Sequence, residues 1–242
     1  EYHPIRPWRR HFRVARRDHR KLLIVDNRVA FAGGHNIGLE YAPIAEGGLG
    51  WHDVHLRCEG PVVVAAERLF RATWIGQGGA IYPVQRELLA MWSRPAETAL
   101  AQLVHNRRLR QRFRFRRAYL QAIRRATASI SIMNAYFVPD RGIRVALKQA
   151  ANRGVIVRLI LPGVSDLRVV RFATQRMYTS LLRAGVRILE WPERMMHAKT
   201  AVIDGVWAMV GSYNLDNMSL RYNLEVGVAV VDRAFGKRMS DE

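Results

Sequence analysis

Two short stretches of this chain carry a histidine, a lysine and an aspartate at the same spacing, His-x-Lys-x4-Asp, inside apolar runs. The motif residues are His19, Lys21 and Asp26 in DHRKLLIVD and His197, Lys199 and Asp204 in HAKTAVID. On a strand, residues two apart project to the same face, so the histidine and lysine of each copy can reach one site. An imidazole can attack phosphorus or donate a proton near neutral pH, and an ammonium can neutralise a nonbridging oxygen. The pattern therefore favours chemistry on a phosphate group.

The similarity between the two copies continues beyond the motifs. Gly33 and Asn36 follow the first motif at the positions that Gly211 and Asn214 occupy after the second, and one offset of 178 positions relates every pair. A shared offset over this many chemically distinctive residues indicates an internal duplication. Small residues permit close approach of a ligand, and amides and hydroxyls can bind phosphate oxygens. The candidate phosphate-binding residues are Asn36, Ser212 and Asn214.

Acidic residues are expected to play two different parts. Asp26 and Asp204 stand at an odd offset from their histidines and precede turn residues, so we expect them to organise a turn or an interface instead of transferring protons. A catalytic histidine also needs a carboxylate on its second nitrogen to orient the ring. The candidates are Asp53 in the first half and Glu225 in the second, each on the strand after its motif.

The composition points to an anionic partner. A net charge of +19 suits nucleic acid, an anionic membrane surface or a phosphorylated substrate. Only four of the 39 basic residues are lysines, yet two of them, Lys21 and Lys199, occupy equivalent motif positions. A single cysteine, Cys58, excludes an intramolecular disulfide. The other histidines lack any such pairing, so ordinary packing roles are expected for His3, His11, His35, His52, His55 and His105.

The elements that must position these residues alternate between strand and helix. A strand, turn and strand are predicted from His19 to Ala32, with further strands at 52–60 and Asn223–Val231. The predicted helices are Val62–Trp74, Tyr119–Ala128, Ile143–Asn152 and Val169–Ala184, and the predicted extended segments between them are Ser129–Phe137, Val155–Leu161 and Val186–Trp191. This alternation predicts an α/β fold with a buried central sheet.

The repeats divide the chain into residues 1–106 and 107–242. Because residues 113–178 have no counterpart before the first motif, the first repeat is expected to be truncated at its N-terminus. The arginine-rich segment 107–125 is interpreted first as a linker running into an amphipathic helix. Contact of its arginines and aromatic residues with a membrane surface, or stacking on single-stranded nucleic acid, are the alternatives.

The doubled motif, followed by GG or GS and then Asn, closely resembles the phospholipase D superfamily. Within it, HRKLLIVDNRVAFAGGHNIGLEY, WHDVHLRCEGP, NAYFVPD and GSYNLDNMSLRYNLEVGVAVVD are most similar to bacterial cardiolipin synthases of the type without N-terminal transmembrane helices. The resemblance implies two repeats, each a mixed β-sheet flanked by helices, that meet at a pseudo-twofold interface. It also implies that both His-Lys-Asp motifs are catalytic, with one histidine forming a phosphohistidine and the other protonating the leaving alcohol, without metal or cofactor. We expect His19 to be the nucleophile and His197 the acid.

The resemblance further implies synthesis of cardiolipin from phosphatidylglycerol by transphosphatidylation. The implied partners are an anionic phospholipid and the bacterial inner membrane, met peripherally at its cytoplasmic face, while the oligomeric state stays open. A phospholipase D-type hydrolase, a nuclease acting on nucleic acid, and an inactive membrane-binding fragment are the alternatives.

Overall fold

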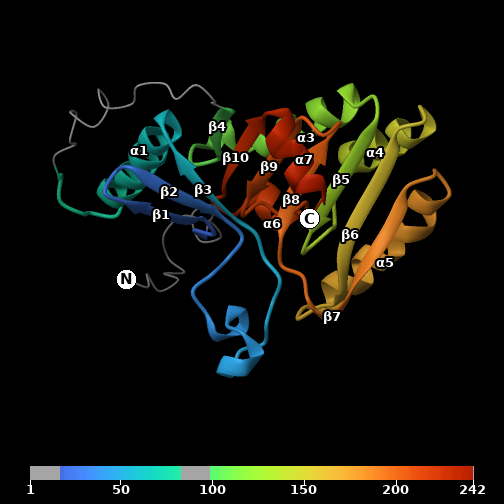
Figure 1. Ribbon diagram of the computed structural model, residues 1–242, viewed down its shortest axis with the longest axis horizontal. Helices are drawn as coiled ribbons and strands as arrows, with labels where there is room; N and C mark the ends of the chain where they lie inside the picture. The colour runs from blue at the N-terminus through green and yellow to red at the C-terminus, as the bar shows by residue number, and fades with distance from the viewer. Residues whose placement is uncertain (1–16, 83–98, 242) are drawn as a thin grey trace, which may run out of the picture.

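The computed structural model describes residues 17–82 and 99–241, and within these ranges the chain forms two β-sheets with helices packed on them (Figure 1). The smaller sheet is antiparallel, in the order β1-β2-β3, and the larger sheet has the order β4-β10-β9-β8-β5-β6-β7. In the larger sheet β6 pairs in parallel with β5 and β7, and the remaining pairs are antiparallel. The predicted α/β class with mixed sheet is thereby confirmed.

The smaller sheet follows the first motif. Its elements are β1 (Lys21–Val25), β2 (Val29–Gly33), β3 (His55–Glu59) and the helix α1 (Pro61–Gly76), with the 3-10 turns η1 (Leu39–Tyr41) and η2 (Ile44–Glu46) between β2 and β3. Pro61 occupies the first turn of α1, where a missing N–H costs no helical hydrogen bond. The segment between β2 and β3 projects away from the sheets (Figure 1).

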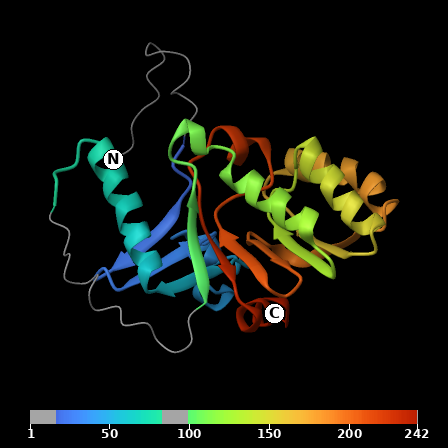
Figure 2. The ribbon, with the colours of Figure 1, turned by 90° about the horizontal axis from the view of Figure 1, so that it is seen from above.

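The larger sheet contains the second motif. Its strands are β4 (Leu100–His105), β5 (Ser129–Asn134), β6 (Ile156–Val164), β7 (Arg187–Met195), β8 (Lys199–Ile203), β9 (Trp207–Gly211) and β10 (Val226–Val231). Its helices are η3 (Leu109–Gln111), α3 (Arg114–Arg125), α4 (Arg141–Asn152), α5 (Arg168–Leu182), α6 (Asn217–Arg221) and α7 (Arg233–Asp241). Figure 2 shows α3 and α4 on one face of this sheet and the C-terminal α7 on the other.

The hairpins that carry the two motifs have the same geometry. Val25 pairs with Val29 across β1–β2, and Ile203 pairs with Trp207 across β8–β9, which is the same register 178 positions later. All four residues of the turns Asp26-Asn27 and Asp204-Gly205 have positive φ angles, between 51° and 61°. Two consecutive residues of this kind form the tight turn whose twist matches a β-hairpin. The strand, turn and strand predicted for each motif are therefore present.

A shared apolar core joins the two sheets. Ala30 and Cys58 from the smaller sheet and Leu69 of α1 pack in one cluster with Val226 and Val228 of β10. Burial of this surface holds the sheets together, at about 25 cal/mol for each Å² of apolar area removed from water. A second cluster, between the larger sheet and helices α3, α4 and α5, forms the main core. Because β10 contributes to the first cluster, the strand after the second motif lies against the hairpin of the first.

Two predictions differ from the structure in detail. Strand β4 was not expected, and although it precedes the predicted division at residue 106, it pairs with β10 as a member of the larger sheet. Helix α3 begins at Arg114 instead of Tyr119, and Phe115 and Tyr119 are fully buried in the main core. These two aromatic rings therefore cannot enter a bilayer or stack on bases, whereas Phe113, just before the helix, is exposed. The amphipathic helix predicted for this segment is present, and contact of its exposed side with a membrane or nucleic acid stays an alternative. In the described ranges no helix has the length and apolarity required to cross a membrane.

Candidate active site

Two short backbone bridges bring the motifs to the other half of the molecule. Asp18 forms a parallel bridge with Leu224, and Met196 forms one with His52. In each bridge the backbone amide of the motif histidine donates a hydrogen bond to the opposite chain segment: His19 N donates to Leu224 O (3.0 Å), and His197 N donates to His52 O (2.6 Å). Each motif histidine is thus placed beside the residue that follows its bridging partner, and in both cases that residue is acidic.

The histidines and the predicted carboxylates form two pairs that are exchanged between the halves. His19 Nδ1 lies 3.0 Å from Glu225 Oε2, and His197 Nδ1 lies 2.7 Å from Asp53 Oδ2. Both carboxylate side chains are fully buried. A carboxylate that accepts from Nδ1–H fixes the tautomer and leaves Nε2 free for chemistry. Each half therefore orients the histidine of the other half, and neither half contains a complete pair.

The motif lysines lie beside the same groups, Lys199 buried and Lys21 half-buried. Lys21 Nζ donates to His19 O (2.8 Å), and Lys199 Nζ donates to His197 O. Burial lowers the pKa of Lys21 to about 8 and that of Lys199 to about 7, although Asp53 and Glu225 oppose the shift in both. Because each lysine interacts with the carboxylates of both halves, the two motifs form one site. A phosphate dianion or diester in this site would favour the charged lysines.

The two histidines differ in accessibility. The side chain of His19 is 27% exposed and that of His197 is 5% exposed. Burial lowers the pKa of His197, although its hydrogen bond to Asp53 acts in the opposite direction. Trp51 and Tyr136 lie against the His197 ring, with centroids 5.7 and 5.9 Å away. One histidine therefore faces solvent and the other is enclosed.

Tyr41 links a predicted phosphate-binding residue to His197. Its hydroxyl lies 2.8 Å from His197 Nδ1 and accepts a hydrogen bond from Asn36 Nδ2 (3.0 Å). Its ring also meets that of His197, with centroids 5.8 Å apart. Asn36 thus contacts the site through Tyr41 in the structure without ligand.

The small residues after each motif are required by the strand beside them. A Cβ at Gly211 would lie 2.6 Å from Val226 O, and one at Gly33 would meet the carbonyl of Val54. At the next position the halves differ, because Gly34 leaves room for the Asp53 carboxylate whereas Ser212 donates its hydroxyl to Glu225. The approach of the strand to within hydrogen-bonding distance delivers the carboxylates to the site.

The remaining phosphate-binding candidates are buried. Ser212 hydrogen-bonds to Glu225 and to the backbone of Val226. Within the described residues, the side-chain oxygen Oδ1 of Asn214 and the oxygen Oε1 of Glu225 are buried with no hydrogen-bond partner. Buried polar atoms in folded proteins almost always have partners. These two are candidates for contact with a bound substrate.

The motif aspartates have the structural positions expected from the sequence. Asp204 accepts hydrogen bonds from the backbone amides of Thr127 (2.9 Å), Ala128 (2.8 Å) and Ser129 (2.8 Å), which fastens the hairpin turn to the start of β5. Asp26 is exposed in the equivalent turn. Neither has a hydrogen bond to a motif histidine, so their place in the catalytic motif does not reflect contact with the imidazoles.

Other histidines contribute differently. His35 stacks on Tyr41 (centroids 4.5 Å apart) and His52 stacks on Trp191 (4.5 Å), while the backbone of His52 positions His197. His3 and His11 lie outside the described residues.

The aromatic wall around His197 was not predicted from the sequence. The segment from Asn36 to Asp53 is six residues longer than that from Asn214 to Glu225, and its extra length supplies Tyr41 and Trp51. That difference in spacing was the sequence signal from which an additional structural feature near Asp53 could have been predicted. Tyr136 comes from the end of β5, where its hydroxyl donates to Asp166 (2.9 Å).

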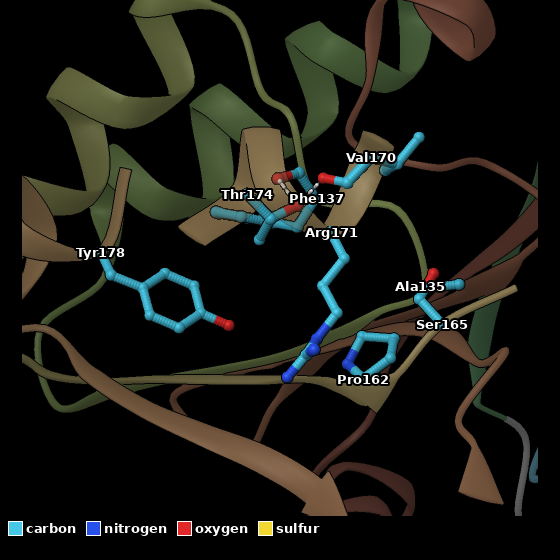
Figure 3. A pocket seen from close by; sticks show the side chains of 8 residues that line it. All are labelled: Ala135, Phe137, Pro162, Ser165, Val170, Arg171, Thr174 and Tyr178. Carbon is cyan, nitrogen blue, oxygen red and sulfur yellow. Dashed lines mark hydrogen bonds between the residues drawn. The ribbon is translucent and has the colours of Figure 1, made fainter. Parts of the chain in front are cut away.

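A small hollow lies behind this wall. It is bordered by Ala135 and Phe137, the neighbours of Tyr136, and by α5 (Figure 3). Neither motif histidine lines it. The hollow is therefore a neighbour of the active site and is not the reaction centre.

Comparison with known proteins assigns the chain to a family. Residues 119–242 match the family described as cardiolipin synthase, PLD-like domain. The chain belongs to this phospholipase D-like family. It is 34% identical over 236 residues to cardiolipin synthase A of Pseudomonas fluorescens (strain SBW25), covering 96% of this chain and 48% of the relative. It is 36% identical over 232 residues to cardiolipin synthase B of Escherichia coli (strain K12), covering 94% of this chain and 55% of the relative.

The chain thus spans about half the length of these curated members of the family. Among solved structures, phosphatidylserine synthase of Haemophilus influenzae Rd KW20 superimposes with a TM-score of 0.61 at 12% identity, covering 90% of this chain and 59% of that one. At this identity the likeness shows a shared fold. The fold and the family agree with the resemblance inferred from the motifs.

Proposed function

We propose that this chain carries the reaction centre of a phosphatidyltransferase that makes cardiolipin from two molecules of phosphatidylglycerol. In this proposal the halves are two phospholipase D-like repeats related by a pseudo-twofold axis. The observation that carries it is the exchanged pairing of His19 with Glu225 and His197 with Asp53, beside one buried and one half-buried lysine. Two oriented imidazoles and two cations suit in-line displacement at a phosphodiester.

In the first step Nε2 of His19 attacks phosphorus, and the bond from phosphorus to the glycerol oxygen breaks. His19 is assigned as nucleophile because its ring is the more accessible one. The Nε2 proton of His197 passes to the leaving oxygen, and glycerol departs. Although burial lowers the pKa of His197, a bound phosphate places a negative charge nearby and raises it again, so substrate binding itself promotes protonation of the acid.

In the second step the terminal hydroxyl of another phosphatidylglycerol attacks the phosphohistidine. His197 takes the hydroxyl proton, the phosphorus–nitrogen bond breaks, and cardiolipin leaves with His19 restored. Lys21 and Lys199 neutralise the nonbridging oxygens in both steps, while Asn36, Ser212 and Asn214 are assigned to binding of the phosphate. Water in place of the second lipid would give phosphatidic acid, which is the hydrolase alternative.

The proposed setting follows from the substrate. Phosphatidylglycerol is an anionic bilayer lipid, and the +19 charge of the chain favours an anionic surface. We propose peripheral association with the cytoplasmic face of the bacterial inner membrane. A nuclease would use the same residues and the same charge, and it is the second candidate.

The test is incubation with phosphatidylglycerol vesicles labelled in the phosphatidyl group, followed by separation of cardiolipin, phosphatidic acid and glycerol. We expect cardiolipin from the unmodified chain and a loss of at least about 100-fold in His19→Asn and in His197→Asn. His105→Asn, on β4 in the larger sheet, is the matched histidine control and should retain activity. Rapid quenching with a denaturant at mildly alkaline pH should trap label on His19, because the phosphorus–nitrogen bond of a phosphohistidine is labile in acid.

Label on serine or aspartate would refute the phosphohistidine scheme. Release of nucleotides from DNA by a chain that gives no lipid product would instead favour the nuclease.

A further inference from the structure

The segment between β2 and β3 exposes an unusual amount of apolar surface. Four aliphatic side chains within thirteen residues are more than half exposed: Ile37 (110%), Leu39 (65%), Ile44 (54%) and Leu49 (59%). Single exposed aliphatic residues are common, but a cluster of this density marks a surface that meets another apolar phase. The same segment contributes Tyr41 and Trp51 to the wall around His197. Its inner side thus serves the site, and its outer side is unpartnered within the described structure.

A second exposed apolar stretch runs from the end of β6 into α5. Val169 is 82% exposed and Phe172 63% exposed. The guanidinium of Arg176 lies 5.8 Å from the centre of the Phe172 ring. Figure 3 shows that Val170, Arg171 and Thr174 of the same helix border the hollow, which leaves positions 169, 172 and 176 on a different face. An outward face of aromatic, aliphatic and arginine side chains is typical of a helix at a lipid interface.

The loop that carries the first stretch is held beside the end of β6, where the second stretch begins. His52 N donates to Met195 O (2.9 Å), and Met195 is paired with Val164 at the end of β6. The chain from Val164 leads directly into α5. In Figure 1 the segment with η1 and η2 projects at the bottom of the molecule, on the side where β6 and β7 end.

The charge of this rim is mixed. Arg168, Arg176 and Arg194 are exposed, and so is Glu46, while Glu40 is half-buried. The rim itself is therefore not a strong electrostatic contact, and the +19 charge of the whole chain supplies the long-range attraction to an anionic surface. Salt screens this attraction, so any binding of the chain to vesicles that remains at high salt must come from the insertion of apolar side chains.

We propose that residues 37–49 and the face of α5 that carries Val169 and Phe172, together called the apolar rim, insert into the interfacial layer of an anionic lipid bilayer and hold the active site at the headgroups. This inference rests on the proposed function, since a lipid substrate gives the site a reason to be at the bilayer. A phosphodiester at the membrane surface then lies at the level of the site, and its acyl chains remain in the bilayer.

The first experiment measures partitioning of the full chain onto vesicles containing phosphatidylglycerol at about 1 M salt, where the Debye length is about 3 Å and charge attraction is screened. The loop variant replaces Ile37, Leu39, Ile44 and Leu49 with serine, and the helix variant is Val169→Ser with Phe172→Ser. We expect the loop variant to reduce partitioning about 100-fold and the helix variant about tenfold. Leu182→Ser is the matched control, because Leu182 is 52% exposed at the other end of α5, about 20 Å from Val169, and it should bind as the parent does.

A second measurement does not depend on how well a multiple variant folds. Cys58 is buried, so an environment-sensitive fluorophore on Ile44→Cys can be attached selectively. Its emission should shift to the blue when vesicles are added, and the same label on Leu182→Cys should not respond. Equal responses at the two positions, or unchanged partitioning of both rim variants, would overturn the proposal.

The outcomes also separate this inference from the proposed function. Turnover of short-chain, monomeric phosphatidylglycerol should survive in the rim variants, because Tyr41 is kept and no replaced residue belongs to a motif or to the aromatic wall around His197. If the parent binds vesicles through the rim but produces no cardiolipin, the proposed function fails and the rim assignment stands. If the rim variants turn a dimer into a monomer without vesicles, as seen by analytical ultracentrifugation, the rim is a contact between two copies and the membrane assignment is wrong.

Discussion

Replacement of Lys199 by methionine should change the pH dependence of stability in a predictable direction. In the folded chain without ligand, burial lowers the pKa of Lys199 to about 7, compared with the ordinary value of 10.5. Between these two values the unfolded chain binds a proton that the folded chain lacks. The free energy of unfolding of the parent therefore rises with pH, by at most about 1.4 kcal/mol per pH unit from this group. Between pH 7.5 and 8.5 Lys199 should contribute about 1 kcal/mol of that rise.

The assay is urea denaturation at pH 7.5 and at pH 8.5. Lys199→Met should show a rise smaller than that of the parent by about 1 kcal/mol, because methionine fills similar space without a titrating group. Lys237→Met, at an exposed lysine of α7, should behave as the parent. Saturating inorganic phosphate should also flatten the parent curve, because a bound anion keeps the lysine protonated. Equal pH slopes for the parent and Lys199→Met would refute the assignment of a buried lysine with a lowered pKa.

Three further perturbations test other contacts of the structure. Asp204→Ala should lower the free energy of unfolding by about 2–3 kcal/mol more than Asp26→Ala in chemical denaturation, because three backbone amides lose their acceptor at Asp204 while the positive φ disfavours alanine at both positions. Asp53→Asn removes the charge that raises the pKa of His197, so the alkaline limb of the pH–rate profile, where the acid His197 loses its proton, should move to lower pH and turnover should fall at least about 100-fold while circular dichroism is unchanged. Gly211→Ala should cost about 2 kcal/mol or more in the same denaturation assay, because the new Cβ would lie 2.6 Å from Val226 O.

Local patterns in the sequence predicted the elements, and the tertiary partners account for what was missed. The motif hairpins were predictable because apolar residues flank turn residues in both copies, and the structure has them at the same register. Strand β4 was not predictable from the sequence, because LAQLVH is short and lies before an arginine-rich segment. Its strand character comes from pairing with the edge of β10, which no local pattern reports.

Contacts between residues far apart in the chain also limited what the sequence could predict about the site. Asp53 and Glu225 could be identified as the carboxylates near the strands predicted after the motifs, and in the structure they lie just before β3 and β10, but sequence position suggested that each would serve its own half. The exchange arises from the bridges Asp18–Leu224 and His52–Met196, which join residues far apart in the chain. Tyr136 gave no signal at all, since it reaches His197 from the end of a strand in the main core.

The exchanged histidine–carboxylate pairs have a consequence for how such a protein could arise. When two identical subunits meet on a twofold axis, every contact from a residue of one subunit to a residue of the other occurs a second time with the subunits exchanged. His19 with Glu225 and His197 with Asp53 have this reciprocal form, although both now lie in one chain. A dimer of a single-motif chain with the same contacts would contain the same complete site, so the reciprocal pairing is what an internal duplication predicts. The longer loop with Tyr41 and Trp51 lies on one side only, and it encloses one histidine opposite an open one.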